Sequence, residues 1–369
     1  MRPGITLIVM VKDDAKRLER CLKSAATSVD EIIVLDTGSK DNSINVAKEY
    51  GAKVIELPWQ DAYDVAINHV IDHVETEWIL RLDSDEWLVP NQEKQIRELM
   101  EDQTAFAYLL VRIDQFPNDN VGEMTMIRMW RNDPLMRYVG TVHENFPHET
   151  LSQCSRGRFI AETNLSFNHD GYLHGISQAK RERNWQLLHK ELSIRPGNLY
   201  FEIHISDAYC ERNPKAGWDS VKKLAKKAAE DESDDCPLDA WALLFMRYFQ
   251  MLPESDLFSE LTDAIIIRTW RWFARFPNVM WAKSLVDLRR NNKWQAFQAL
   301  SQLEHLSLTG EYSRWGHVDP AFLTFGLWQN LAQAAHQIGK IEVARRNYLK
   351  LLEVNPGNRK IIEILESLG

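Results

Sequence analysis

Short apolar runs and helically spaced apolar residues alternate over the first part of the chain. Apolar spacing typical of amphipathic helices occurs between the runs and predicts helices at residues 15–26, 42–50 and 65–74. The runs have the length of strands and lie at residues 5–11, 31–35, 53–57 and 77–82. Strands that alternate with helices in this way build a mainly parallel sheet covered by helices on both faces. The pattern therefore predicts an α/β fold.

From about residue 175 the pattern changes to helical stretches with few strand signals. Residues 180–192 are charged and helical, and later helical stretches are separated by proline- and glycine-containing turns. We therefore expect two domains, an α/β domain over residues 1–175 and an α-helical array over residues 176–369.

The segment 330–356 resembles one tetratricopeptide unit, which consists of two packed helices. Small residues stand where the two helices would cross, Gly339 stands at the turn and Pro356 follows the second helix. Earlier units are degenerate, so the number of repeats stays open. Such an array also offers a surface through which two copies of the chain could form a homo-oligomer.

The length of 369 residues fits two domains, since a typical domain has about 100–200 residues. The four cysteines, at positions 21, 154, 210 and 236, show no metal-binding spacing, which favours a reduced, cytoplasmic setting. The N-terminal apolar run is too short for a secretory signal or a membrane helix, so we expect no membrane-spanning segment.

The net charge of -9 argues against a protein that coats nucleic acid with a generally basic surface. Residues 268–276 still interleave cations with aromatics, which could stack on bases or sugars. A helix with its aromatics inward and its arginines outward is the interpretation that we favour.

Three carboxylates stand within four residues at the end of the run 77–82, in the segment 83–86. Clustered carboxylates repel one another, and a bound cation relieves the repulsion. Asp and Ser are also ordinary turn and cap residues, so the cluster alone does not decide. A second polar loop, 36–39, follows the run 31–35. Parallel strands end at a shared edge where ligands bind, which favours a ligand site.

Several motifs in a fixed order resemble family 2 glycosyltransferases of the GT-A fold. The most similar subgroup carries tetratricopeptide-like helices and includes the peptide S-glycosyltransferases of glycocin pathways. The resemblance spans roughly residues 5–190. The motifs that carry it are residues 8–14, 29–43, 50–52, 83–86, 128–132, 142–144 and 169–172.

The resemblance implies a donor that is a nucleotide sugar, linked to uridine diphosphate, and a divalent cation, Mn²⁺ or Mg²⁺. The cation would act as a Lewis acid on the departing diphosphate. Asp83 and Asp85 match the acidic motif, whose second carboxylate is the usual metal ligand while the first often reaches the ribose. Asp36 matches the position that reads the uracil or the ribose, and the backbone amides of Gly38 and Ser39 could join it.

Inverting transfer needs a base that takes a proton from the acceptor. The resemblance makes Glu144 the first candidate and Glu86 the second. His143 and His169 are candidates for a further metal ligand or a phosphate contact, although lone histidines are often structural.

Arg128 and Arg131 could grip phosphate, or they could lie on a solvated strand edge. The chain also departs from the family. Asp13-Asp14 stands where relatives have Asn-Glu, which adds charge near the nucleotide. Asn68 is kept but Ile67 replaces an arginine, so Arg81 is a candidate to replace the lost contact to a phosphate or to the acceptor.

Two other classes of function compete with a glycosyltransferase. A nucleotidyltransferase would carry a glycine-rich basic loop after its first strand, but residues 12–15 contain no glycine. A non-enzymatic interaction protein would use the helical array and keep the first domain as a relic, which the intact acidic motif argues against. The acceptor stays open: a peptide or protein could bind the concave array, and a glycan or modified nucleic acid could bind the Trp-rich helices between residues 241 and 294.

Overall fold

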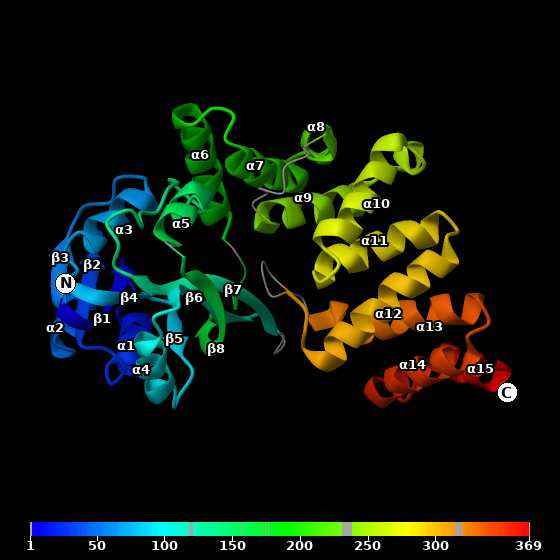
Figure 1. Cartoon of the computed structure of the whole chain (residues 1–369), viewed down its shortest axis with the longest axis horizontal. Coiled ribbons are helices and arrows are strands. Elements are labelled where there is room, and N and C mark those ends of the chain that lie inside the picture. The colour runs from blue at the N-terminus through cyan, green and yellow to red at the C-terminus, as the bar shows by residue number, and fades with distance from the viewer. Residues whose placement is uncertain are drawn as a thin grey trace. The chain divides into compact units, whose positions relative to one another are not determined.

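The computed structural model describes residues 2–117, 121–155, 157–173, 175, 177–230, 238–313, 318 and 320–368. Cys236 lies outside these residues. The chain forms two compact units, Met1–Asn198 and Leu199–Gly369. Figure 1 shows the strands in the first unit and a succession of helices in the second.

All seven elements that the hydrophobic pattern predicts in the first unit are present, with ends that shift by a few residues. The first unit contains β1 (Arg2–Val11), α1 (Ala15–Ala25), β2 (Glu31–Asp36), α2 (Ser43–Glu49), β3 (Lys53–Glu56), α3 (Tyr63–Ile71), β4 (Thr76–Asp83), β5 (Glu86–Leu88), α4 (Glu93–Glu101), β6 (Ala105–Gln115), β7 (Val121–Arg131), α5 (His148–Ser155), β8 (Phe159–His169) and α6 (Gln178–Ile194).

The strands form one eight-stranded sheet in the order β3-β2-β1-β4-β7-β6-β8-β5. The part from β3 to β4 is parallel throughout, as the alternation of strands and helices predicts. Beyond β4 the sheet is mixed, because β7 runs antiparallel to both of its neighbours. The α/β fold is thus confirmed, with an antiparallel insertion beside β4.

The pairings beyond β4 return to the carboxyl end of that strand. β5 begins at Glu86, only three positions after the end of β4 at Asp83, yet it pairs with β8 at the other end of the strand order. β4, β7, β6, β8 and β5 therefore form a ring of strands, and the turn 84–85 closes it.

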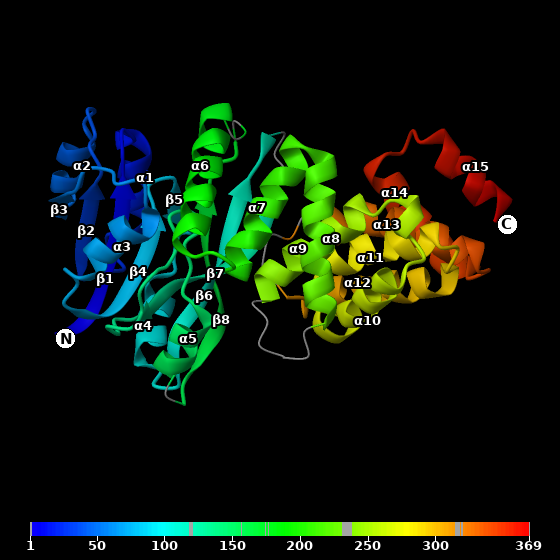
Figure 2. The same ribbon diagram turned by 90° about the horizontal axis from the view of Figure 1, so that it is seen from above.

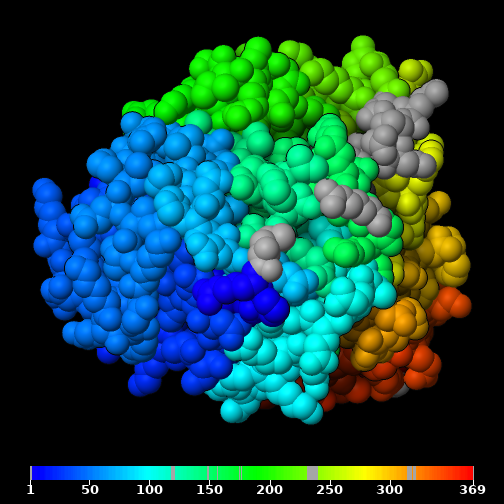
Figure 3. All heavy atoms as spheres, turned by 60° about the vertical axis from the view of Figure 1, so that its left-hand side comes forward, coloured from blue at the N-terminus to red at the C-terminus, as the bar shows by residue number. Residues whose placement is uncertain are grey.

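Helices cover both faces of this sheet. Apolar residues of α1, α2 and α4 pack in a core with one face, and those of α3 and α5 pack in a core with the other. Figure 2 shows the sheet with its helices from a second direction. The exposed N-terminal end of β1 reaches the surface, in dark blue in Figure 3. The loops at the carboxyl ends leave from the other edge of the sheet.

Helix α6 belongs to the first unit, because it holds a loop of that unit. The amide of Thr141 donates to the carboxylate of Glu191 at 2.7 Å, and the Thr141 hydroxyl donates to the carbonyl of Leu187 at 2.8 Å. The units divide after Asn198, whereas the change of hydrophobic pattern suggests a boundary near residue 175.

The described part of the second unit is helical. It contains α7 (Leu199–Arg212), α8 (Pro214–Glu230), α9 (Leu238–Met251), α10 (Glu260–Trp272), α11 (Pro277–Arg289), α12 (Lys293–Thr309), α13 (Phe325–Gln337), α14 (Ile341–Val354) and α15 (Arg359–Ser367), with short 3₁₀ turns at Glu254–Asp256 and Pro320–Phe322. No helix in the described ranges is both long enough and apolar enough to cross a membrane.

Helices α13 and α14 form the expected pair, joined through Gly339 at a φ of 74°. Their assignment as a tetratricopeptide unit stays a prediction. The aromatic and cationic segment 268–276 is helical up to Trp272. Phe273 is fully buried, whereas the Trp270 side chain is 38% exposed, so its aromatics point inward only in part.

Candidate active site

The carboxyl ends of three neighbouring strands bring the predicted site residues to one edge. In the sheet register Val11 pairs with Asp36, and Met10 pairs with Asp83. The loops 12–14, 37–42 and 84–85 therefore leave the sheet side by side. The position of Asp36, Asp83 and Asp85 at one edge follows from the parallel part of the sheet.

Asp36 organises the loop that follows β2. Its carboxylate Oδ1 accepts hydrogen bonds from the amides of Gly38 and Ser39, at 2.9 and 2.8 Å. Gly38 has a φ of 106°, which a residue with a side chain rarely adopts. The other oxygen, Oδ2, is buried and has no hydrogen-bond partner among the residues described. A buried carboxylate oxygen of this kind is suited to accept a hydrogen bond from a ligand.

Asp13 and Asp14 join the neighbouring loops. The Asp13 amide donates to the Ser39 hydroxyl at 2.9 Å, and the Asp13 carboxylate accepts from the Lys40 amide at 2.6 Å. The Ser84 hydroxyl donates to Asp14 at 3.2 Å. Burial raises the pKa of Asp14. Asp13 and Asp14 thus connect the loops after β1, β2 and β4.

Asp85 and His169 face each other across a gap that needs a glycine. Nε2 of His169 lies 3.5 Å from Oδ2 of Asp85. A Cβ on Gly171 would lie 2.4 Å from that nitrogen and 2.7 Å from that oxygen, closer than real Cβ atoms come. Burial acts to lower the pKa of His169, but hydrogen bonds with Asp114 and Asp85 raise it to about 9. Burial acts to raise the pKa of Asp85, and His169 lowers it overall.

This pair could supply two ligands to a divalent cation whose other ligands come from phosphate and water. Carboxylate oxygen and imidazole nitrogen are both ligands of Mn²⁺-type cations, and two ligands of one cation can lie about 3–3.5 Å apart. In the described ranges no three His, Cys, Asp or Glu side chains gather as a metal site. Cations that act on phosphates commonly take one or two protein ligands and complete their shell with phosphate and water.

Asp83 faces two arginines. Its carboxylate lies 3.2 Å from Arg81 and 2.9 Å from Arg128. Burial acts to raise the pKa of Asp83, but these guanidinium groups hold it well below its usual range. The predicted metal ligand Asp83 is thus placed in an ion-pair network next to the Asp85–His169 pair.

Glu86 lies in the same network and is enclosed. Its carboxylate contacts Arg128 at 2.7 Å and accepts from the Asp83 amide at 2.9 Å. The residue is 1% exposed, and burial raises its pKa. This position makes Glu86 a partner of Arg128 rather than a group that reaches an acceptor.

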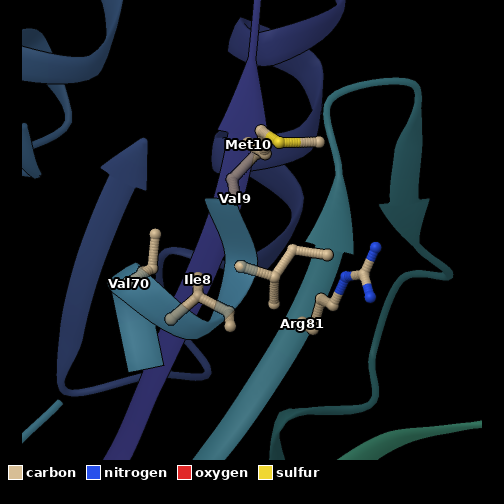
Figure 4. Close-up of a pocket in the computed structure, with 6 residues that line it drawn as sticks. Ile8, Val9, Met10, Val70 and Arg81 are labelled. Atoms are coloured by element: carbon tan, nitrogen blue, oxygen red, sulfur yellow. The ribbon is translucent and has the colours of Figure 1, made fainter. Parts of the chain in front are cut away.

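Arg81 connects Asp83 to Glu144. A nitrogen of Arg81 lies 2.6 Å from Oε1 of Glu144, and the guanidinium lies over the ring of Tyr138 at 4.8 Å. Figure 4 shows Arg81 beside a small cavity with a mostly apolar lining, with its guanidinium directed away from Val70 and Ile8. This cavity encloses about 10 Å³, which is room for about one water molecule and not for a nucleotide.

Two side chains of α3 hold the loop 138–144, which carries Glu144. The Asn68 side chain donates to the carbonyl of Tyr138 and accepts from its amide, both at 2.9 Å. Asp64 accepts from the amide of Gly140 at 2.9 Å. Asn68 therefore uses both its polar groups on the protein itself. His143 is exposed in this loop, with a φ of 53°.

Arg131 lies away from this group. Its side chain donates to the carbonyls of Ala105 and Asp102 at 3.2 and 2.9 Å, and it lies over the ring of Trp78 near the start of β4. The structure thus joins Arg81, Arg128 and three carboxylates in one ion-pair network beside Asp85 and His169. Arg131 instead lies near the start of β4, away from this network.

The structure adds residues that the sequence analysis did not single out. Arg112 and Asp114 lie behind His169, and Arg17 and Arg20 form ion pairs with Asp170 at 3.2 and 2.7 Å. Charged residues at alternating positions 112 and 114 of an otherwise apolar run were a usable signal, because alternation places them on one face of a strand.

Residues 6–167 match the family described as Glycosyl transferase family 2. A TPR repeat-containing protein of Synechococcus elongatus is 32% identical over 53% of this chain and 50% of its own length. The SPbeta prophage-derived glycosyltransferase SunS of Bacillus subtilis is 27% identical over 56% of this chain and 50% of its own. The chain thus spans about half the length of these relatives.

Among solved structures, the mannosyltransferase PcManGT from Pyrobaculum calidifontis, in complex with GDP-Man and Mn²⁺, is 16% identical with a TM-score of 0.39. The match covers 74% of this chain and 88% of that one.

Proposed function

We propose that this chain, whose residues 6–167 match the family described as Glycosyl transferase family 2, transfers a sugar from a nucleotide sugar to an acceptor with inversion at the anomeric carbon. The proposed donor is a uridine diphosphate sugar, used with Mn²⁺ or Mg²⁺ in the cytoplasm. The observation that carries the proposal is the pairing of Asp85 with His169 across the gap at Gly171, on the sheet edge that also bears Asp36.

In this proposal the donor lies along the carboxyl edge. The uracil or ribose contacts the buried Oδ2 of Asp36, whose other oxygen is held by the amides of Gly38 and Ser39. Asp85 and His169 would hold the cation, and a bound cation would neutralise negative charge on the departing diphosphate. Arg81 and Arg128 keep Asp83 ionised beside them.

Glu144 is the proposed base. Its carboxylate takes the proton of the acceptor group while that group attacks the anomeric carbon. The bond from this carbon to the diphosphate breaks on the opposite side, and the diphosphate leaves with the electron pair. Arg81 holds one oxygen of Glu144 at 2.6 Å and so fixes the direction of the carboxylate. Acceptors to be screened are peptides, glycans and modified nucleic acid.

The first experiment is thermal unfolding with uridine diphosphate, with and without Mn²⁺. A ligand at a hundredfold excess over its dissociation constant stabilises the native state by about 2.7 kcal/mol. We expect a rise in the unfolding temperature that needs Mn²⁺ and that is lost in Asp85→Ala. Glu49→Ala, a change on the exposed face of α2, is the control.

The result against the proposal is equally clear. If neither uridine, guanosine nor cytidine diphosphate raises the unfolding temperature with either cation, the acidic turn is not a working donor site. A non-enzymatic role of the helical unit would then be the better interpretation.

A further inference from the structure

Behind His169 lies a buried ion pair that the proposed reaction does not use directly. Asp114 on β6 is fully buried, and its Oδ1 lies 2.6 Å from Nδ1 of His169. Arg112 contacts the same carboxylate twice, from Nε to Oδ1 at 2.8 Å and from a terminal nitrogen to Oδ2 at 3.1 Å. Both oxygens of Asp114 are therefore held before any ligand arrives.

The strand register fixes these side chains beside one another. β6 and β8 run parallel with Asp114 opposite His169, while Glu86 of β5 lies opposite His169 on its other side. Arg112 and Asp114 share a face because side chains two positions apart on a strand point the same way. Placing the ring of His169 thus depends on three strands that meet at this point.

The contact with Asp114 also decides which nitrogen of His169 faces the gap. An ionised carboxylate accepts hydrogen bonds and donates none, so the hydrogen between the two groups stands on Nδ1. Nε2 is then the ring nitrogen that faces Asp85, whose Oδ2 lies 3.5 Å away. Ligating histidines are commonly held by a carboxylate in this way, and the carboxylate sets the orientation of the ring.

We propose that Asp114, held by Arg112, is a positioning residue that keeps Nε2 of His169 directed at Asp85 and thereby makes the site prefer Mn²⁺ over Mg²⁺. The inference rests on the proposed function, because it requires a divalent cation between Asp85 and His169. Imidazole nitrogen favours transition metals, whereas Mg²⁺ prefers oxygen ligands. Without a fixed imidazole the cation retains mainly oxygen ligands, and the preference for Mn²⁺ shrinks.

The test is calorimetric titration of the full chain with Mn²⁺ and with Mg²⁺, in the presence of uridine diphosphate. In Asp114→Ala we expect the dissociation constant for Mn²⁺ to rise by about 10–100-fold, as is typical when the partner of a ligating histidine is lost. The constant for Mg²⁺ should change far less. Asp114→Asn keeps an oxygen that accepts from Nδ1, so its Mn²⁺ affinity should lie between those of the wild type and Asp114→Ala. Asp102→Asn, in the turn before β6, is the matched control.

A second measurement covers the case in which Asp114→Ala does not fold. Nitrogen-15 spectra of the histidine rings report which nitrogen carries hydrogen, and His169→Gln identifies the signals of His169. Zn²⁺ replaces Mn²⁺ in this experiment because Zn²⁺ is diamagnetic. After addition of Zn²⁺, we expect the hydrogen of the His169 ring to stand on Nδ1 in the wild type. A hydrogen on Nε2 instead would overturn the proposal.

The outcomes separate the two proposals. If Asp85→Ala abolishes cation binding while a folded Asp114→Ala keeps the Mn²⁺ to Mg²⁺ preference of the wild type, the positioning role is wrong and the donor site stands. If Asp85→Ala itself leaves cation binding unchanged, the proposed cation site is wrong and the positioning role falls with it.

Discussion

Arg81 holds the carboxylate of Glu144, the proposed base, and substitution of Glu144 tests its role. We expect Glu144→Gln to lower kcat by about 10²–10⁴-fold, because the amide cannot take the proton of the acceptor. Binding of uridine diphosphate with Mn²⁺ should change little, since Glu144 is not part of the donor contacts proposed above. Steady-state kinetics and thermal shift measure the two effects.

The matched control for that change is Glu149→Gln, at an exposed position of α5. A Glu144→Gln variant that keeps kcat within a few-fold of the wild type would exclude Glu144 as the base. Because Glu86 is enclosed by Arg128, the search for a base would then turn to another residue of the edge.

Asp30 makes stability depend on pH at a point far from the reaction. The hydrogen bond from Arg97, at 2.7 Å, holds the pKa of Asp30 below its usual range. A carboxylate with a lowered pKa contributes stability above its unfolded pKa of about 3.9, and this contribution is lost as the pH falls through its folded pKa. We expect Asp30→Asn to lower the unfolding temperature at pH 7 and to have a smaller effect near pH 3. Equal effects at both pH values, relative to Glu49→Gln, would contradict this assignment.

At the scale of elements, helix α3 carries the loop with the proposed base. Asn68→Ala removes both side-chain hydrogen bonds to the backbone of Tyr138, which should cost about 1–3 kcal/mol of stability. We expect kcat to fall while the KM for the donor stays near that of the wild type. Asn45→Ala, at an exposed position of α2, is the control. A raised KM with an unchanged kcat would instead support a direct contact of Asn68 with the donor.

Helix α11 buries an ion pair between Lys283 and Asp287, which are 0% and 2% exposed. Burial lowers the pKa of Lys283 and raises that of Asp287, so burial acts against both charges. We expect Lys283→Met alone to destabilise the protein by about 3–5 kcal/mol, because it leaves Asp287 charged and buried. Chemical denaturation measures this cost.

The double change Lys283→Met with Asp287→Leu should recover most of that stability, since hydrophobic replacement of a whole buried pair is often neutral or favourable. Lys360→Met, at an exposed position of α15, controls for the loss of a positive charge. A double variant as unstable as the single one would show that the pair itself stabilises the helical unit.

The hydrophobic pattern predicts the parallel part of the fold well because a helix lies between each strand there and the next one along the chain. It predicts the edge on which Asp36, Asp83 and Asp85 meet for the same reason. The hydrophobic pattern did not predict the antiparallel strands β6 and β7. No helix separates these two strands, and β7 pairs with β4 although the two are distant in the sequence.

The sequence does not show which side chains of the site contact one another. Nothing in the spacing of Arg81, Arg128 and Glu86 shows which carboxylate each arginine holds, because that depends on three strands meeting. Asp114 was missed since it lies 55 residues before His169 and touches it only through the pairing of β6 with β8.

At the scale of the whole molecule, the two compact units should respond differently to the donor. Hydrogen exchange of the chain with uridine diphosphate and Mn²⁺ should show added protection at residues 36–39, 83–86 and 169–171. Helices α13 and α14 should exchange at unchanged rates, because every proposed donor contact lies in the unit Met1–Asn198. Comparable protection of α13 and α14 would show that the donor also acts on the helical unit.

The ring of strands that ends at the turn 84–85 has a consequence for the order in which the protein folds. The parallel strands β1 to β4 lie within residues 2–83, whereas the ring closes only when Glu86 of β5 meets His169 of β8, much later in the chain. During synthesis the pairing of β5 with β8 therefore cannot form until β8 has been made, whereas β1 to β4 are already present. In a ribosome-bound chain from which β8 has not yet emerged, we therefore expect the parallel strands β1 to β4 to be able to pair. The same chain should not bind the cation, because His169 lies at the end of β8.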